Sequence, residues 1–271
     1  MRNVCLCLVF FFSTLFTGYG QSKEDLLASG KAHLEKKEFQ AALAAFNAYL
    51  KLNPTSADGY FYRGLAQTSG GMIDHAIPDY TKAIGLNPNH VQAYLKRGEL
   101  HLMFEEFDNA SADFRKLIKL DPSNADGYLM QAILNHRLGI YHEALPDLEK
   151  AIQLNPKKAE SFYYRGLTYK EQQKYPEAVA DLLQVAVLDP EFNSIQYDLG
   201  LAYYQWQKYP EALTCLDKTI ALSPDWQKAY RLRSKIKLAL GDKKGAAKDL
   251  AIVEDLKEAD EPWAKDERDD F

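Results

Sequence analysis

The stretch KLNPTSADGYFYRGLA, Lys51 to Ala66, contains the first proline of a series that recurs at a constant spacing along the chain. Each proline closes a phrase of the form Leu-x-Pro, and each later one lies 34 residues after the one before it: Pro54, Pro88, Pro122, Pro156, Pro190 and Pro224. A fixed period between about 20 and 50 residues is typical of stacked structural repeats. The sequence therefore predicts a repeat protein.

The spacing of apolar residues inside each period predicts helices. Apolar residues recur three and four positions apart, as they do on one face of an α-helix, and no alternating strand pattern is visible. Pro176 and Pro210 fall where the second helix of a repeat would begin, and the first turn of a helix tolerates proline. The Leu-x-Pro phrase would end that helix, because the residue before a proline disfavours helical geometry. Each repeat is therefore predicted to contain two helices and two turns.

The pattern within these periods resembles the tetratricopeptide repeat, a helix-turn-helix unit with the same period. With Pro54 at position 32 of that pattern, position 20 is alanine throughout, which would let two helices pack closely: Ala42, Ala76, Ala110, Ala144, Ala178, Ala212 and Ala246. The resemblance implies an all-α fold, a right-handed superhelical solenoid of about seven repeats over residues 23–260. The repeats, numbered 1 to 7, would start at residues 23, 57, 91, 125, 159, 193 and 227.

The N-terminal residues 1–20 differ in composition from the repeats. They contain one arginine, an apolar run and small residues before Gln21, which is the layout of a cleaved signal peptide. We therefore expect export to the periplasm or the extracellular space. The alternative is an uncleaved membrane anchor formed by residues 4–17. Cleavage would leave Cys215 as the only cysteine, so no intramolecular disulfide is expected.

Charged residues pair by position within the repeats. Every repeat with arginine at position 7 has aspartate at position 23. Because the two helices of a repeat would run antiparallel, these positions should lie level with each other. The sequence predicts four ion pairs of bidentate type: Arg63–Asp79, Arg97–Asp113, Arg165–Asp181 and Arg233–Asp249. In repeat 4, Gln131 lies opposite Asp147, and its amide can still donate a hydrogen bond.

The resemblance further implies that another face of each first helix lines a concave groove that binds partners. In this sequence that face is apolar and rich in tyrosine, which suits protein binding. The predicted groove residues are Phe61, Tyr62, Leu65, Lys96, Glu99, Leu129, Met130, Ile133, Tyr163, Tyr164, Leu167, Tyr197, Asp198, Leu201 and Tyr204. The alternative is that some of these rings simply pack between adjacent repeats.

Composition and motifs exclude several functions. A net charge of -5 argues against a dedicated nucleic-acid binder. We find no phosphate-binding loop, nucleophile elbow or zinc-protease motif, and His136 and His142 fall on different predicted helices. We therefore expect no enzyme activity, no cofactor, no metal site and no small-molecule substrate. Contact with a membrane is expected only if the N-terminal segment stays uncleaved.

The resemblance implies a non-catalytic scaffold that binds a protein or peptide segment in the tyrosine-rich groove. The alternative is an accessory subunit of an envelope assembly or secretion system that does not bind peptides independently. The tail at residues 261–271 is acidic, and repeat 7 is rich in lysine and arginine. The tail could fold back over the last repeat, or it could be disordered beside a solvated end of the solenoid.

Overall fold

The computed structural model describes residues 22–192 and 194–256, and this part of the chain is all-α, as the sequence predicted. The first helices of the seven pairs are α1 (Lys23–Glu35), α3 (Ala57–Ser69), α5 (Val91–Met103), α7 (Ala125–Arg137), α9 (Ala159–Glu171), α11 (Ile195–Gln205) and α13 (Gln227–Ala239). The second helices are α2 (Phe39–Leu52), α4 (Ile73–Leu86), α6 (Phe107–Leu120), α8 (Tyr141–Leu154), α10 (Tyr175–Leu188), α12 (Tyr209–Leu222) and α14 (Lys243–Asp255). No strand is present in these ranges.

The helix ends follow the local sequence signals. Each second helix from α2 to α12 ends at the leucine of a Leu-x-Pro phrase. Several first helices begin with a capping side chain, as where the side chains of Ser56 and Asn124 accept hydrogen bonds from backbone amides in the first turn. Pro176 and Pro210 lie in the first turns of α10 and α12. The prolines and capping residues of the sequence therefore mark where the helices begin and end.

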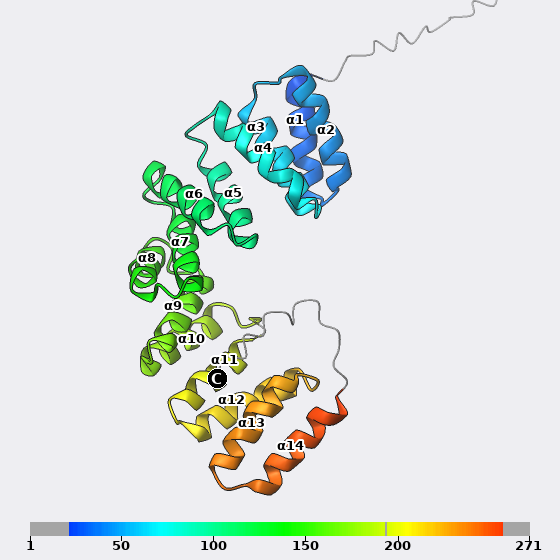
Figure 1. The fold of residues 1–271 in the computed structure, drawn as a ribbon. Coiled ribbons are helices and arrows are strands. Elements are labelled where there is room, and N and C mark those ends of the chain that lie inside the picture. Colours follow the sequence, from blue (N-terminus) through cyan, green and yellow to red (C-terminus); the bar gives the residue numbers. More distant parts are fainter. Residues whose placement is uncertain (1–21, 193, 257–271) are drawn as a thin grey trace, which may run out of the picture. The chain divides into compact units, whose positions relative to one another are not determined.

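The described residues form two compact units, residues 22–97 and residues 98–256. In the first unit α1 packs on α2 and α3 on α4, and in the second the pairs are α7 with α8, α9 with α10, α11 with α12, and α13 with α14. Figure 1 shows these pairs as antiparallel hairpins. Each unit is therefore a series of helical hairpins.

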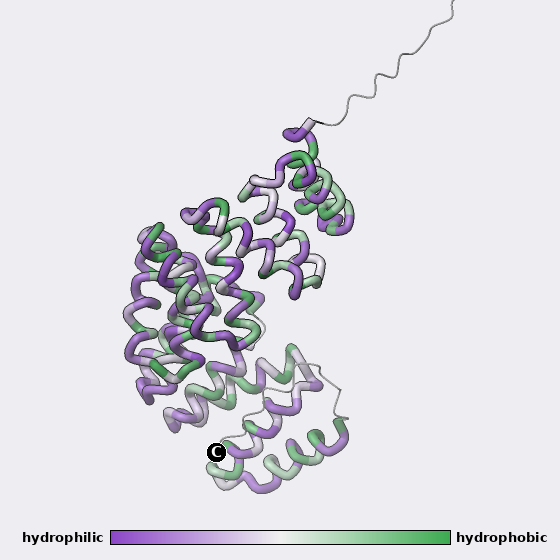
Figure 2. Tube along the Cα trace, turned by 45° about the horizontal axis from the view of Figure 1, so that its top comes forward, coloured by the Kyte–Doolittle hydropathy of each residue, from purple (hydrophilic) through white to green (hydrophobic). Residues whose placement is uncertain are grey.

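Small residues bring the two helices of each pair together. The alanines at position 20 are almost completely buried, and Phe46, Tyr80 and Phe114 at position 24 are fully buried beside them. A side chain at Gly64 would place its Cβ only 2.8 Å from the ring of Tyr80, so the backbone there must carry glycine. Figure 2 shows hydrophilic and hydrophobic residues interspersed along the helices, as expected when each helix buries one face. Leu250 differs, with 43% exposed, because no described helix follows α14.

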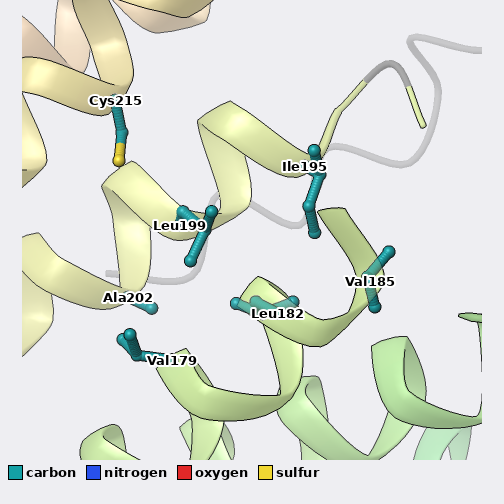
Figure 3. Close-up of a cluster of buried hydrophobic side chains, with 7 residues drawn as sticks. All are labelled: Val179, Leu182, Val185, Ile195, Leu199, Ala202 and Cys215. Carbon is teal, nitrogen blue, oxygen red and sulfur yellow. The ribbon is translucent and has the colours of Figure 1, made fainter. Parts of the chain in front are cut away.

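Successive hairpins share their apolar cores. Figure 3 shows one such cluster, which joins α10 to α11 and the neighbouring α12 and contains Val179, Leu182, Val185, Ile195, Leu199, Ala202 and Cys215. The thiol of Cys215 is free and buried. Because one hairpin cannot bury this surface alone, the hairpins stabilise one another as in other repeat proteins.

Three predictions concern segments outside the described residues. These are the signal peptide at residues 1–20, the alternative anchor at residues 4–17, and the acidic tail at residues 261–271. Within the described ranges, every helix is too short or too polar to cross a membrane.

Candidate functional site

Arginine and aspartate pair within three repeats. Each arginine donates from both Nε and Nη2 to the two carboxylate oxygens: Arg63 to Asp79 at 2.7 and 2.6 Å, Arg165 to Asp181 at 2.7 and 2.8 Å, and Arg233 to Asp249 at 3.0 and 2.6 Å. These side-chain hydrogen bonds are the main cause that raises the pKa of each arginine. The fourth predicted pair, Arg97–Asp113, spans the two units and stays a prediction.

Three of the four arginines at position 7 also have a second hydrogen-bond partner, which was not predicted from the sequence. It lies at position 25 of the preceding repeat, on the second helix, and accepts from Nη1: Asn47 for Arg63 at 2.8 Å, Thr81 for Arg97 at 3.0 Å, and Asp217 for Arg233 at 2.7 Å. An oxygen-bearing side chain at this fixed position is a signal that the sequence already contained.

An aromatic ring completes the surroundings of each guanidinium. The ring lies at position 4, one helical turn before the arginine, and the Cζ-to-centroid distances are 5.4 Å for Arg63 on Tyr60, 5.9 Å for Arg97 on Tyr94, 5.6 Å for Arg165 on Phe162, and 5.3 Å for Arg233 on Tyr230. These distances suit a cation–π interaction. We call this arrangement the arginine cage: the aromatic ring at position 4 and the aspartate at position 23 of a repeat, which together surround the arginine at position 7. In some repeats an acceptor at position 25 of the preceding repeat is added.

Repeat 4 has the cage without the arginine. The Nε2 atom of Gln131 donates to Asn135 at 3.4 Å, so the hydrogen bond expected from Gln131 to Asp147 is not formed among the described residues. Burial raises the pKa of Asp147 from 3.8 to about 6, with a further contribution from Glu143 and an opposing one from Arg115. The Asp147 carboxylate therefore lacks the compensation that Asp181 receives from Arg165.

The structure separates the predicted groove residues into two groups. Phe61, Leu129 and Ile133 are buried, with 8%, 0% and 5% of their surface exposed, so they pack inside and offer little surface to a partner. The others are half-buried: Tyr62, Leu65 and Lys96 in residues 22–97, and Glu99, Met130, Tyr163, Tyr164, Leu167, Tyr197, Asp198, Leu201 and Tyr204 in residues 98–256. The surface that can contact a partner is therefore smaller than the predicted set.

Several of these rings, all at position 5, also pack on a ring at position 34, the last position of the same repeat. The centroid distances are 4.7 Å for Phe61 and His90, 4.8 Å for Tyr163 and Phe192, and 5.1 Å for Tyr197 and Trp226. The position 5 rings thus have a structural role between helices. The recurrence of rings at both positions 5 and 34 is the signal that would have identified this role.

The polar groups beside these rings are also engaged within the fold. Asp198 accepts hydrogen bonds from Ser194 Oγ at 2.8 Å and from Tyr163 Oη at 3.3 Å. Burial raises the pKa of Asp198, while the bond from Ser194 and the charge of Lys170 act against that rise. This network fixes Tyr163 in place.

Tyr164 differs from its neighbour. Its ring lies edge-on to Tyr163 at 5.5 Å and to His136 of α7 at 6.1 Å. No hydrogen bond from its hydroxyl to another described residue is present, and burial raises the pKa of that hydroxyl. Tyr164 is therefore a half-buried ring whose polar tip can still serve a partner.

Comparison with known families identifies the repeats. Tetratricopeptide repeat models match residues 27–77, 71–125, 104–159 and 197–260 in one case, residues 148–180 in a second, and residues 166–207 in a third. The matches together span most of the described chain. No curated protein matches the chain significantly.

Solved structures share the fold. A tetratricopeptide repeat protein from Parabacteroides merdae is 22% identical, with a TM-score of 0.67, and the match covers 88% of this chain and 94% of that one. YrrB, described as a TPR protein with an unusual peptide-binding site, is 26% identical, with a TM-score of 0.57 and coverage of 68% and 95%. PilF from Pseudomonas aeruginosa is 20% identical, with a TM-score of 0.64 and coverage of 74% and 91%.

Proposed function

The chain belongs to the tetratricopeptide repeat family, and from this membership we propose that it is a non-catalytic scaffold for a protein or peptide partner. The partner would lie along the face formed by Met130 of α7, Tyr164 and Leu167 of α9, and Leu201 and Tyr204 of α11. We call this the aromatic face. All five residues belong to residues 98–256 and are half-buried.

The observation that carries this proposal is the position of Tyr164. From its place on α9 its ring reaches His136 on the first helix of the preceding repeat, the residue is half-buried, and its hydroxyl has no hydrogen-bond partner among the described residues. Tyrosine offers a large contact area with few rotatable bonds and a polar tip, and it is enriched at protein interfaces. Leu167, one turn further along α9, would add apolar contact on the same side of the helix.

Similarity to YrrB supports peptide recognition by repeats of this kind. That protein is described as having a peptide-binding site, and it shares 26% identity with 68% of this chain. The proposal assigns Tyr163 and Asp198 a supporting role, because their hydrogen bond already occupies both polar groups. Substituting them would disturb the fold together with the surface.

The test begins with a partner captured on the immobilised protein and identified by mass spectrometry. The affinity of the purified partner is then measured by calorimetry for the wild type and for Tyr164→Ala. We expect at least a tenfold loss, about 1.4 kcal/mol, because a central interface tyrosine is removed.

Tyr169→Ala is the matched control. It removes the same side chain from the same helix, but Tyr169 lies against Arg165 of the ion pair on another side of α9. We expect less than a twofold change in affinity. Equal losses in both variants, or no loss in either, would place the binding surface elsewhere.

We also propose that the scaffold acts outside the cytoplasm after removal of residues 1–20. The support is the sequence layout of that segment. Mass spectrometry of the protein purified from its native source tests this: a chain that begins at Gln21 is expected. A chain that retains the segment would favour the alternative anchor at residues 4–17.

A further inference from the structure

A pocket lies in repeat 4 at the place where other repeats hold their arginine. It has a volume of about 470 Å³, and its lining includes Tyr128, Gln131, Glu143, Asp147 and Arg115. Its volume falls in the range of about 300–1,000 Å³ that is usual for ligand sites. The pocket lies wholly within residues 98–256.

The lining residues occupy the positions of an arginine cage. Tyr128 is at position 4 of repeat 4, Gln131 at position 7 and Asp147 at position 23. In repeat 5 the residues that correspond to Tyr128 and Asp147 are Phe162 and Asp181, and they hold the guanidinium of Arg165. Repeat 4 therefore keeps the aromatic ring and the carboxylate of the cage but provides no guanidinium.

Besides Asp147, the lining residue Gln131 has a polar atom without a hydrogen-bond partner in the described part of the chain. Gln131 is only 5% exposed, and its buried Oε1 atom accepts no hydrogen bond. A buried acceptor without a donor is unfavourable by roughly 1–3 kcal/mol. Among the described residues, no cation lies within ion-pair distance of Asp147 either. The pocket thus presents the Asp147 carboxylate to whatever enters it, and a rotation of the Gln131 amide would add a second acceptor.

We propose that this pocket binds the guanidinium group of an arginine side chain presented by a protein partner. The group would donate to Asp147 while lying against the ring of Tyr128, and a rotation of the Gln131 amide would let its Oε1 atom accept as well. The contacts with Asp147 and Tyr128 match those that the chain forms around Arg63, Arg165 and Arg233, whereas the acceptor at position 25 of the preceding repeat is replaced by Arg115. The fork of donors in guanidinium suits it better than the single ammonium group of lysine.

The charges around the pocket favour a cation. Glu143, one turn before Asp147 on α8, adds a second carboxylate to the lining, while Arg115 of α6 adds a positive charge and His142 also lines the pocket. Arg115 is exposed and forms no ion pair with Asp147, so its side chain can turn toward solvent. The high pKa of Asp147 agrees with a carboxylate whose charge is not fully compensated.

This inference goes beyond the proposed function and does not depend on it. Gln131 and Tyr128 lie on a different side of α7 from Met130, which belongs to the aromatic face. A partner could therefore use the arginine site alone, the aromatic face alone, or both.

The test is a titration of the ¹⁵N-labelled protein with a pentapeptide, acetyl-Gly-Gly-Arg-Gly-Gly-amide, followed by NMR. We expect saturable shifts at residues 128, 131, 143 and 147, with a dissociation constant in the millimolar range, as suits one side chain. The citrulline peptide has the same shape without the charge and should bind at least tenfold more weakly. The lysine peptide should fall between them.

Two variants identify the site. Gln131→Arg places a guanidinium in the cage and should abolish the shifts, and Asp147→Asn removes the carboxylate and should weaken binding at least fivefold. Asp147→Asn keeps the side-chain volume, whereas Gln131→Arg adds volume that the pocket would accommodate, and the unfolding transitions of both variants report whether the fold is intact. Methylguanidinium tests whether the pocket binds a small free cation instead of an arginine side chain. Binding of methylguanidinium without binding of the arginine peptide would contradict the proposal of a protein partner.

Three other outcomes would overturn the proposal. The first is equal binding of the arginine and citrulline peptides. The second is unchanged binding in Gln131→Arg. The third is a silent wild type together with binding in Arg115→Ala, which would mean that Arg115 itself fills the pocket in solution.

Discussion

Repeats 4 and 5 pack in the same way but differ in their charges. Ala144 and Leu148 in repeat 4 are fully buried, as are Ala178 and Leu182 in repeat 5. Repeat 5 adds the bidentate bond of Arg165, whereas repeat 4 has a glutamine and a pocket. Small and large apolar residues are therefore sufficient to pair the helices. The arginine is thus not required for this packing, which leaves the cage of repeat 4 free for the recognition that we propose.

The largest expected effect comes from making repeat 5 resemble repeat 4. Arg165→Gln leaves Asp181, which is only 5% exposed, without its cation. Removing one partner of a buried pair destabilises a protein by about 3–5 kcal/mol. Because Arg165 itself is partly exposed, we expect the lower end of that range, measured by urea unfolding. The double variant Arg165→Gln with Asp181→Asn should recover part of the loss. A loss well below that range, about 1 kcal/mol or less, would mean that the cage contributes little in repeat 5.

The reverse change in repeat 4 should have a smaller effect of opposite sign. Gln131→Arg supplies a donor fork to Asp147 and should stabilise the protein by about 1 kcal/mol in the same urea experiment. Gln131→Lys is the control, and it should gain less because ammonium cannot bond both oxygens in the same manner. If the arginine variant is less stable than the wild type, the repulsion from Arg115 outweighs the new ion pair.

The pH dependence of stability should expose Asp147. Its pKa in the folded protein lies near 6, above the ordinary 3.8, so the folded state prefers the protonated carboxyl. The contribution of this group is therefore fully present below about pH 4 and is lost as the pH rises toward 6. The wild type should lose stability relative to Asp147→Asn across that window, as measured by urea unfolding at several pH values. A constant difference between the two proteins would contradict a raised pKa.

An effect no larger than that of Gln131→Arg is expected at the turn between the two helices of a repeat. Gly139 in repeat 4 has φ of 72°, and Gln173 at the same position in repeat 5 has φ of 59°. Gly139→Ala should destabilise the protein by about 1 kcal/mol, because a Cβ disfavours left-handed geometry. Gln173→Gly should change stability by less than that, because relief of strain is offset by chain entropy. Thermal unfolding of both variants tests this, and a stabilising Gly139→Ala would contradict it.

The sequence predicted the features that repeat within one hairpin. Proline spacing located the helix ends, and the joint presence of arginine and aspartate indicated contacts such as Arg63–Asp79, which the structure forms. It did not predict the contacts that depend on the next hairpin. Leu129 and Tyr163 both occupy position 5, yet the first is fully buried and the second is half-buried, so the position within the repeat does not by itself set the exposure. The pocket escaped prediction because three helices from two repeats line it.

The most direct test of the arginine site is the titration of the Asp147 carboxyl carbon by ¹³C NMR, with and without the arginine peptide. We expect a midpoint near pH 6 in the free protein, a lower midpoint with the arginine peptide, and no change with the citrulline peptide. A midpoint near the ordinary 3.8 in the free protein, or the same midpoint with and without the arginine peptide, would contradict it.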